Sequence, residues 1–317
     1  MATGESEATV RDYFAEDRER LKEHGPEAMD KAARTEAQRG RRLRERLANN
    51  MALAVLWVAA GITVAALVLI ILYVLINGAH SISPKFIFTW PHGVSAQGGI
   101  WPTIVSTVYV TGLAMLIATP IAVLAAVYLA EYAKQGRIVT IIRFAADSLA
   151  SVPSIVMGLF GLAFFVEAMH LKMSMLSAAL ALALLMLPII MRATEEAIRA
   201  VPRYIRWGSY GLGATKWQTV SKVVLPWAMP RIITGLVLAM GRAIGETAVV
   251  FYTMGMAINL PLSPLDSGRS MAVHLYMLAV DGINMPAAYG TALMLMIVIL
   301  GLNTLAHLIQ RHYRKVR

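Results

Sequence analysis

Two opposite charges lie four residues apart inside a strongly apolar block, in the run M-G-R-A-I-G-E-T-A-V-V. At about 100° per residue, Arg242 and Glu246 share one face of a helix, and each costs about 2.5–3.5 kcal/mol near the centre of a helix in lipid. Two interpretations stay open. The charges neutralise each other as an i,i+4 pair, or the Arg242 guanidinium binds an oxyanion while Glu246 holds it in place. Gly241 and Gly245 point elsewhere, where they allow close contact with a neighbouring helix.

Other kinds of chemistry are limited by what the sequence lacks. No G-x-x-x-x-G-K-[ST] run is present, so the chain has no P-loop with which to energise itself. There is no cysteine, and the seven histidines show no paired spacing, which argues against a buried metal site. A G-x-S-x-G run and paired catalytic carboxylates are also missing. The sequence therefore predicts a chain that is not an enzyme and binds no metal or cofactor.

Long apolar blocks must position the two charges. Of the 317 residues, 57% are hydrophobic and 15% are charged, whereas soluble domains carry roughly 25% charged residues. Most blocks reach the roughly 20 residues that a membrane-spanning helix needs. The six blocks are 52–76, 101–130, 148–169, 173–191, 232–258 and 285–309. This pattern predicts an all-α integral membrane protein with six transmembrane helices, the first an anchor helix over 51–77.

The basic residues follow the expected membrane topology. Of 29 Lys and Arg residues, 25 lie in segments 1–50, 132–143 and 192–231 and in the tail after 310. The positive-inside rule then places both termini in the cytoplasm. The pI of about 9.9 reflects this topology, and no nucleic-acid partner is expected. Segment 1–50 is a charged cytoplasmic arm with 11 basic and 11 acidic residues. Its terminal run R-G-R-R-L-R-E-R either contacts anionic membrane lipid or is solvated and only fixes orientation.

The hydrophilic interruption 192–231 is the most structured of these segments. About 40 residues are too many for a tight turn, and apolar residues recur in it at roughly helical spacing. Prolines and glycines break it at three places. Thr215 and Gln218 stand three apart, as in a capping box. The segment predicts short helices at the water surface, with a glycine bend that offers a docking surface to a partner.

The spacing of Gly213, Val223 and Leu225-Pro226 resembles the EAA loop of ABC-importer permeases, which grip their ATPase subunits through it. The runs G-A-T-K-W-Q-T-V and G-R-A-I-G-E-T-A are most similar to the phosphate (Pst-type) permeases, and G-G-I-W-P and Y-L-A-E-Y-A favour the A-type subunit. The resemblance covers about 98–310. One departure is clear. Where the motif usually has Glu-Ala-Ala, this chain has Trp-Gly-Ser from Trp207 onward, which puts a salt bridge to the ATPase there in doubt.

The resemblance implies a type I ABC-importer permease fold with a core over 98–310 and a cytoplasmic coupling loop over 192–231. It also implies roles for particular residues. The substrate path would contain Arg242 and Glu246, with Arg242 contacting phosphate oxygens. ATPase coupling would use Gly211, Gly213, Ala214, Thr215, Trp217, Leu225 and Pro226.

The implied partners are a homologous C-type permease, a dimer of ATPase subunits that bind ATP and Mg²⁺, and an extracytoplasmic phosphate-binding protein. The implied location is a bacterial or archaeal plasma membrane. Alternatives stay open within the class: the C-type sister subunit, or a permease for molybdate or sulfate. An ATP-independent secondary transporter is a third possibility, although the two halves of the chain show no convincing internal similarity.

The third block carries two further expectations. Asp147 is interpreted as the N-cap that opens this helix, with a role in gating as the alternative. Ser151, Ser154, Gly158 and Gly161 recur at a spacing that places small residues on one side of the helix, suited to close helix contact.

Overall fold

The computed structural model describes residues 49–92 and 97–315. The expected arm over 1–50 therefore lies almost wholly outside the described residues. The chain divides into two compact units, 1–71 and 72–317. The apolar helix Asn49–Ala79 begins in the first unit and is long enough to cross a membrane. It covers the anchor helix that the sequence predicts.

Four more helices in the described residues are long and apolar enough to cross a membrane. They are α3 (Trp101–Val127) continued by the π-helical turn η1 (Tyr128–Tyr132), α6 (Met175–Arg199), the run α8 (Lys216–Thr219), η3 (Val220–Val224) and α9 (Leu225–Gly245), and α12 (Met285–Lys315). A sixth span is formed if α4 (Arg137–Ala150) is counted together with α5 (Ser154–Gly161) and η2 (Leu162–Ala168). The described residues thus hold five candidate spans, or the expected six if this pair, bent by 98°, is counted as one.

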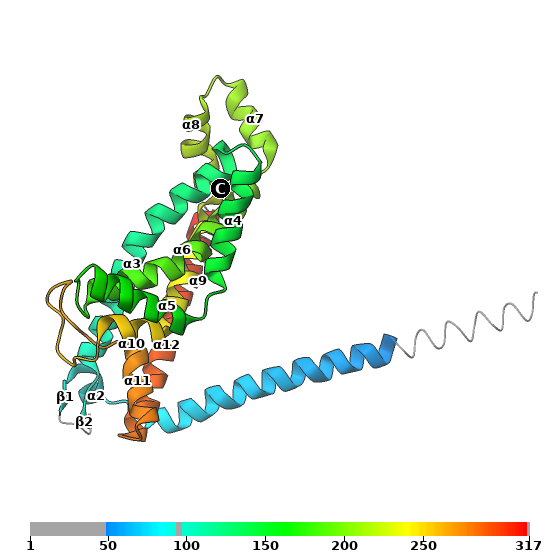
Figure 1. Cartoon of the computed structure of the whole chain (residues 1–317). Coiled ribbons are helices and arrows are strands. Elements are labelled where there is room, and N and C mark those ends of the chain that lie inside the picture. The colour runs from blue at the N-terminus through cyan, green and yellow to red at the C-terminus, as the bar shows by residue number, and fades with distance from the viewer. Residues whose placement is uncertain (1–48, 93–96, 316–317) are drawn as a thin grey trace, which may run out of the picture. The chain divides into compact units, whose positions relative to one another are not determined.

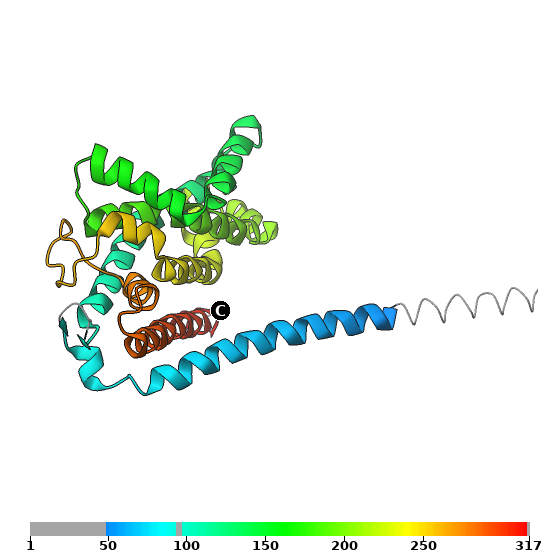
Figure 2. The ribbon, with the colours of Figure 1, turned by 60° about the horizontal axis from the view of Figure 1, so that its bottom comes forward.

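Shorter elements lie at the two ends of the second unit. At one end is α7 (Arg203–Gly211), next to α8 (Figure 1). At the other end lie α2 (Pro84–Phe88), the antiparallel strands β1 (Pro91–His92) and β2 (Gln97–Gly98), and α11 (Met271–Val280). The chain passes from α9 through α10 (Ala248–Met254) to α11, and α12 (red) then returns beside α11 (Figure 2).

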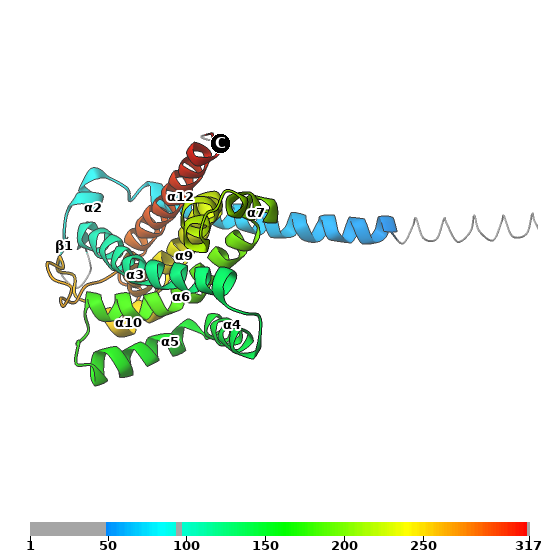
Figure 3. The same ribbon diagram turned by 90° about the horizontal axis from the view of Figure 1, so that it is seen from above.

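The core of the second unit is built around α6, the most deeply buried of its long helices. Seen from above, α6 lies between α3 on one side and α5 and α10 on the other (Figure 3). α3 turns a stripe of small residues inward at four-residue intervals: Ala114, Ala118, Ala122 and Ala126, none of which is exposed. Small side chains let the two backbones approach closely, which stabilises helix pairs in lipid through van der Waals packing.

The hydrophilic interruption is shorter in the structure than the sequence predicts. α6 continues to Arg199, and a helical run begins again at Lys216, so the true connection is 200–215 with α7 inside it. Pro226 does not end the second helix, because it occupies the first turn of α9, directly after the π-helical turn η3. Pro230 lies inside α9. Membrane helices tolerate such prolines where local π adjustments satisfy the freed carbonyls.

The expectation that Asp147 is a helix N-cap is wrong. It lies in the last turn of α4, and its carboxylate faces Arg192 of α6, with 3.0 Å between Arg192 Nη1 and Asp147 Oδ1. The bend comes later, at Pro153, whose ring excludes helical geometry for the residue before it. The small-residue side is confirmed at Gly158 and Gly161. A Cβ at either would come within 3 Å of atoms in α10.

Candidate functional site

A left-handed glycine bend joins α7 to α8. Gly213 has a φ of +82°, and its amide donates to the carbonyl of Tyr210. The capping box is formed as predicted: the Thr215 amide donates to Gln218 Oε1 (2.8 Å), and the Gln218 amide donates to Thr215 Oγ1 (3.3 Å). The bend thus uses a conformation that favours glycine, and the box starts the next helix directly after it.

Large apolar side chains are exposed on both sides of this bend. We define the α7–α8 surface by Tyr204, Trp207, Tyr210, Leu212 and Trp217. Leu212 is 91% exposed and Trp207 67% exposed, and none of the residues in α7 is buried. Large apolar side chains exposed together on one segment are typical of interaction surfaces.

The predicted coupling residues do not all lie on that surface. Gly211, Gly213, Thr215 and Trp217 are exposed on it or beside it, and Ala214 lies between them, partly buried. Leu225 lies elsewhere, in the first turn of α9, where it packs against the cluster that contains Val220 and Val224. Pro226 follows it and is exposed.

The charged step at Arg242 lies where α9 stops. The helix ends at Gly245, and Glu246 leaves it in an extended conformation with a ψ of 118°. Arg242 Nε is 3.5 Å from Glu246 Oε1. That distance exceeds the 2.7–2.9 Å typical of charge-assisted hydrogen bonds. The Arg242 side chain is 48% exposed and that of Glu246 only 12%. The pair therefore forms, but it is loose, and much of the guanidinium faces outward at an interruption of the helix.

The expected close contact at Gly241 and Gly245 is absent from this chain. Within the described residues, no atom comes within 4 Å of a Cβ placed at either position. On α9, that kind of contact is made earlier, by Gly235, where an added Cβ would clash with the Cβ of Ala193 on α6.

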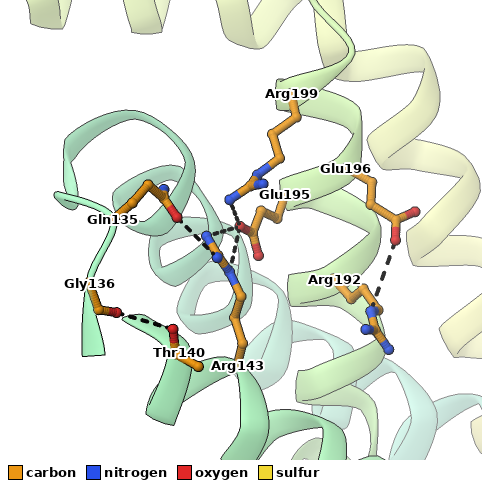
Figure 4. A network of polar contacts seen from close by, with 8 residues as sticks. All are labelled: Gln135, Gly136, Thr140, Arg143, Arg192, Glu195, Glu196 and Arg199. Atoms are coloured by element: carbon orange, nitrogen blue, oxygen red, sulfur yellow. Dashed lines mark hydrogen bonds and ion pairs between the residues drawn. The ribbon is translucent and has the colours of Figure 1, made fainter. Parts of the chain in front are cut away.

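A second charged cluster links α4 to α6 (Figure 4). The almost buried carboxylate of Glu195 accepts a hydrogen bond from Nε of Arg143 on α4 (3.1 Å) and forms an ion pair with the same guanidinium, 2.8 Å from its Nη2. It also lies 2.7 Å from Arg199 Nη2, one turn along α6. Arg143 donates in addition to Gln135 Oε1 (3.2 Å). One acidic group thus holds two guanidinium groups, which fastens α4 to α6.

The comparisons with known proteins match this architecture. Residues 118–315 fit the family described as binding-protein-dependent transport system inner membrane component. The chain belongs to this family of ABC importer permeases. It is 34% identical over 253 residues to the probable ABC transporter permease protein YqgI of Bacillus subtilis, a match that covers 76% of this chain and 86% of that relative.

Two other known proteins are similar to this chain over a larger part of its length. Over 293 residues it is 31% identical to the phosphate transport system permease protein PstA 1 of Mycobacterium tuberculosis, covering 90% of this chain and 95% of that protein. A chain in the crystal structure of a bacterial alginate ABC transporter, in complex with an alginate pentasaccharide-bound periplasmic protein, shares the fold. The TM-score is 0.60 at 14% identity, over 81% of this chain and 94% of that one.

Family membership confirms several predictions for the permease. It is a multi-pass integral protein of the plasma membrane, with the all-helical fold of type I ABC importers. Permease subunits of this family work with ATPase subunits and a substrate-binding protein. Within the described residues, no group of three or more His, Asp or Glu side chains is arranged to hold a metal ion.

Besides the ion pair of Asp147 with Arg192, sequence reasoning missed several other charged contacts of the permease. Glu131 and Arg206 form an ion pair between η1 and α7, and Glu195 pairs with Arg143 across 52 positions of the chain. No local spacing signals either pair. A further contact is at the opposite end of the second unit.

There, Arg269 is buried. Its Nε and Nη2 donate to the carbonyl of Met256 at 3.0 and 2.6 Å. Its Nη1 lies 3.5 Å from Nδ1 of the buried His274 in α11, a helix too short to span a membrane. Burial, together with the charge of Arg269, lowers the pKa of His274 to about 4.

Proposed function

We propose that this chain is the A-type permease subunit of an ATP-driven phosphate importer. The assignment of phosphate as the substrate rests on Arg242, a half-exposed guanidinium at an interruption of α9. In the described part of the chain, Arg242 forms no ion pair besides its loose contact with Glu246. Guanidinium groups suit phosphate oxygens because their planar fork donates two parallel hydrogen bonds. The similarity to PstA 1 over most of the chain supports the same substrate.

In the proposed mechanism, Arg242 binds the anion during its passage, and Glu246 limits how tightly it binds. An anion held only by positive charge would leave slowly, and the nearby carboxylate weakens the field that holds it. Broken helices support such sites in membranes, because irregular backbone is tolerated where it lines a water-filled cavity. The chain itself is proposed to be non-catalytic, with ATP and Mg²⁺ bound by the partner ATPase.

The α7–α8 surface is the proposed contact with the ATPase. Its exposed aromatic side chains supply apolar area where the related motif usually supplies a carboxylate, and Trp207 stands at that place. The distribution of Lys and Arg supports the further proposal that the α7–α8 end, both termini and the charged arm face the cytoplasm. A C-type permease subunit is the proposed second half of the translocation path. Closure of the ATPases on ATP would then move α7 and rock the helices.

Reconstitution tests the proposal. The permease is placed in liposomes with a C-type permease, the ATPase and a phosphate-binding protein, and uptake of radiolabelled phosphate is measured with and without ATP. We expect ATP-dependent uptake that excess molybdate or sulfate does not suppress. Suppression by either anion would assign the permease to another oxyanion. Uptake without ATP would indicate a secondary transporter. Assembly only when the chain replaces the C-type subunit would identify it as that sister.

A further inference from the structure

Arg206 lies on the inner side of α7, away from the exposed aromatic residues that flank it. Its side chain is 16% exposed, whereas Trp207 is 67% exposed. Nε and Nη2 both donate to Glu131 Oε1, at 3.0 and 2.6 Å. The Glu131 side chain is only 8% exposed, and it belongs to η1, the turn that continues α3. The pair therefore joins α7 to the end of α3.

The same guanidinium also closes the end of α6. Its Nη2 donates to the carbonyl of Ile198 (2.8 Å) and its Nη1 to the carbonyl of Val201 (2.6 Å). The last carbonyls of a helix lack partners within it and carry partial negative charge. One side chain of α7 thus bonds to both α3 and α6, the two helices that pack along each other at the centre of the second unit.

Polar contacts dominate the attachment of this region to the rest of the permease. α7 has no buried residue of its own, so apolar packing contributes little beyond the partly buried Ile205. A second contact joins η1 to α8: the ammonium of Lys216 in α8 lies 4.8 Å from the ring centroid of Tyr132 in η1. The hydroxyl groups of Ser209 and Thr219, 2.9 Å apart, join α7 to the helical run behind it.

We propose that Arg206 and Glu131 form the joint through which movement of the α7–α8 surface reaches α3 and α6. This inference rests on the proposed role of that surface as the ATPase contact. A forked, buried pair resists sliding and rotation in a way that an apolar contact does not, because its hydrogen bonds are directional. α3 runs from this joint to the opposite end of the unit (Figure 1). Both residues are positioning residues and touch neither substrate nor nucleotide.

Two conservative variants test the joint in the reconstituted importer. Arg206→Lys keeps the positive charge but loses the two-pronged guanidinium that donates to Glu131. Glu131→Asp keeps the negative charge but shortens the side chain by one methylene group. The matched control is Arg203→Lys, the same change on an exposed residue of the same helix. We expect ATP hydrolysis and ATPase binding to persist in both variants. Phosphate uptake per ATP hydrolysed should fall about fivefold or more, the lower range of coupling energies between sites. The control should leave this ratio unchanged.

A spectroscopic distance separates coupling from simple stability. Spin labels on cysteines at the exposed positions Val108 of α3 and Ile297 of α12 report the movement of α3 when ATP binds. We expect a nucleotide-dependent change in the unmodified importer and in Arg203→Lys, and loss of that change in Arg206→Lys and Glu131→Asp. An unchanged distance response or an unchanged uptake per ATP in the two variants would overturn the joint. So would failure of both to assemble while the control assembles, because the pair would then serve folding alone.

The unmodified importer keeps this test separate from the proposed function. If the α7–α8 surface does not contact the ATPase, a cysteine at Ala214 in an importer that keeps Arg206 and Glu131 will not crosslink to the ATPase. That result would contradict the proposed function itself. If that crosslink forms and ATP moves α3 in the variants as in the unmodified importer, only the joint is wrong.

Discussion

Replacement of Gly213 tests whether the shape of the bend matters for coupling. Gly213 has a φ of +82°, and within the described residues no atom lies within 4 Å of where a Cβ would stand. A Cβ there meets no neighbour, so the cost that can be anticipated is conformational. For an L-residue the left-handed region costs about 1–2 kcal/mol, and a β-branched residue such as valine fits it worst.

The expected size of the effect follows from that cost. A penalty of about 1–2 kcal/mol lowers the population of the native bend roughly 5- to 30-fold relative to alternatives. Membrane insertion should be unaffected, because the bend lies outside the long apolar helices. Gly213→Val should therefore hydrolyse ATP with much reduced phosphate uptake. Gly213→Asn should retain most uptake, since asparagine tolerates the left-handed region.

Gly282 provides a matched control. It has a φ of +61° and equally open surroundings, but it lies between α11 and α12, at the opposite end of the unit. Gly282→Val should carry similar backbone strain without uncoupling ATP hydrolysis from uptake. The assay compares both activities in reconstituted importers, together with crosslinking of a cysteine at Ala214 to the ATPase. Normal transport by Gly213→Val, or the absence of that crosslink, would refute the role of the bend.

Three further outcomes are expected. Trp207→Ala should weaken assembly with the ATPase through lost apolar packing, and the loss should depend little on salt, since no ion pair is screened there; a steep salt dependence would contradict this. The pKa of His274 falls from 6.5 to about 4 on folding. The neutral ring therefore contributes its full stability above pH 6.5. As the pH falls toward 4 this contribution is lost, which lowers the free energy of unfolding by up to about 3 kcal/mol. Melting temperatures in detergent at pH 7 and 4.5 should therefore differ less for His274→Asn than for the unmodified permease, and equal differences would contradict this. Deletion of 1–38 with 39–50 retained should leave uptake close to normal, and complete loss of uptake with the protein still in the membrane would make the arm part of the machinery.

Local patterns in the sequence predicted local structure well. The capping box at Thr215 and the glycine bend before it were both predicted from neighbouring residues, and both are formed. Apolar length alone predicted the membrane class and the number of spans. These features depend on residues within one or two turns of each other, where spacing determines which groups meet.

Contacts between distant segments could not be predicted from one sequence. Arg206 and Glu131 are 75 positions apart, and nothing in the spacing of either residue indicates the other. The prolines were misleading for a different reason. Pro226 indicated a break, but the helical run Lys216–Gly245 continues through it, directly after the π-helical turn η3. Such local π adjustments let a membrane helix tolerate a proline. The loose contact of Arg242 with Glu246 was one of two open interpretations, because spacing fixes neither distance nor exposure.

Phosphate uptake by three variants tests the central claim most directly. Arg242→Gln, Glu246→Gln and the double variant are compared in the reconstituted importer, with assembly and ATP hydrolysis as controls. If Arg242 contacts the phosphate, Arg242→Gln abolishes uptake while the complex still assembles and hydrolyses ATP, and the double variant stays inactive. If the two charges serve only to neutralise each other across their 3.5 Å contact, each single variant is destabilised and the double variant recovers. Uptake near that of the unmodified importer in the double variant would contradict the phosphate-contact role.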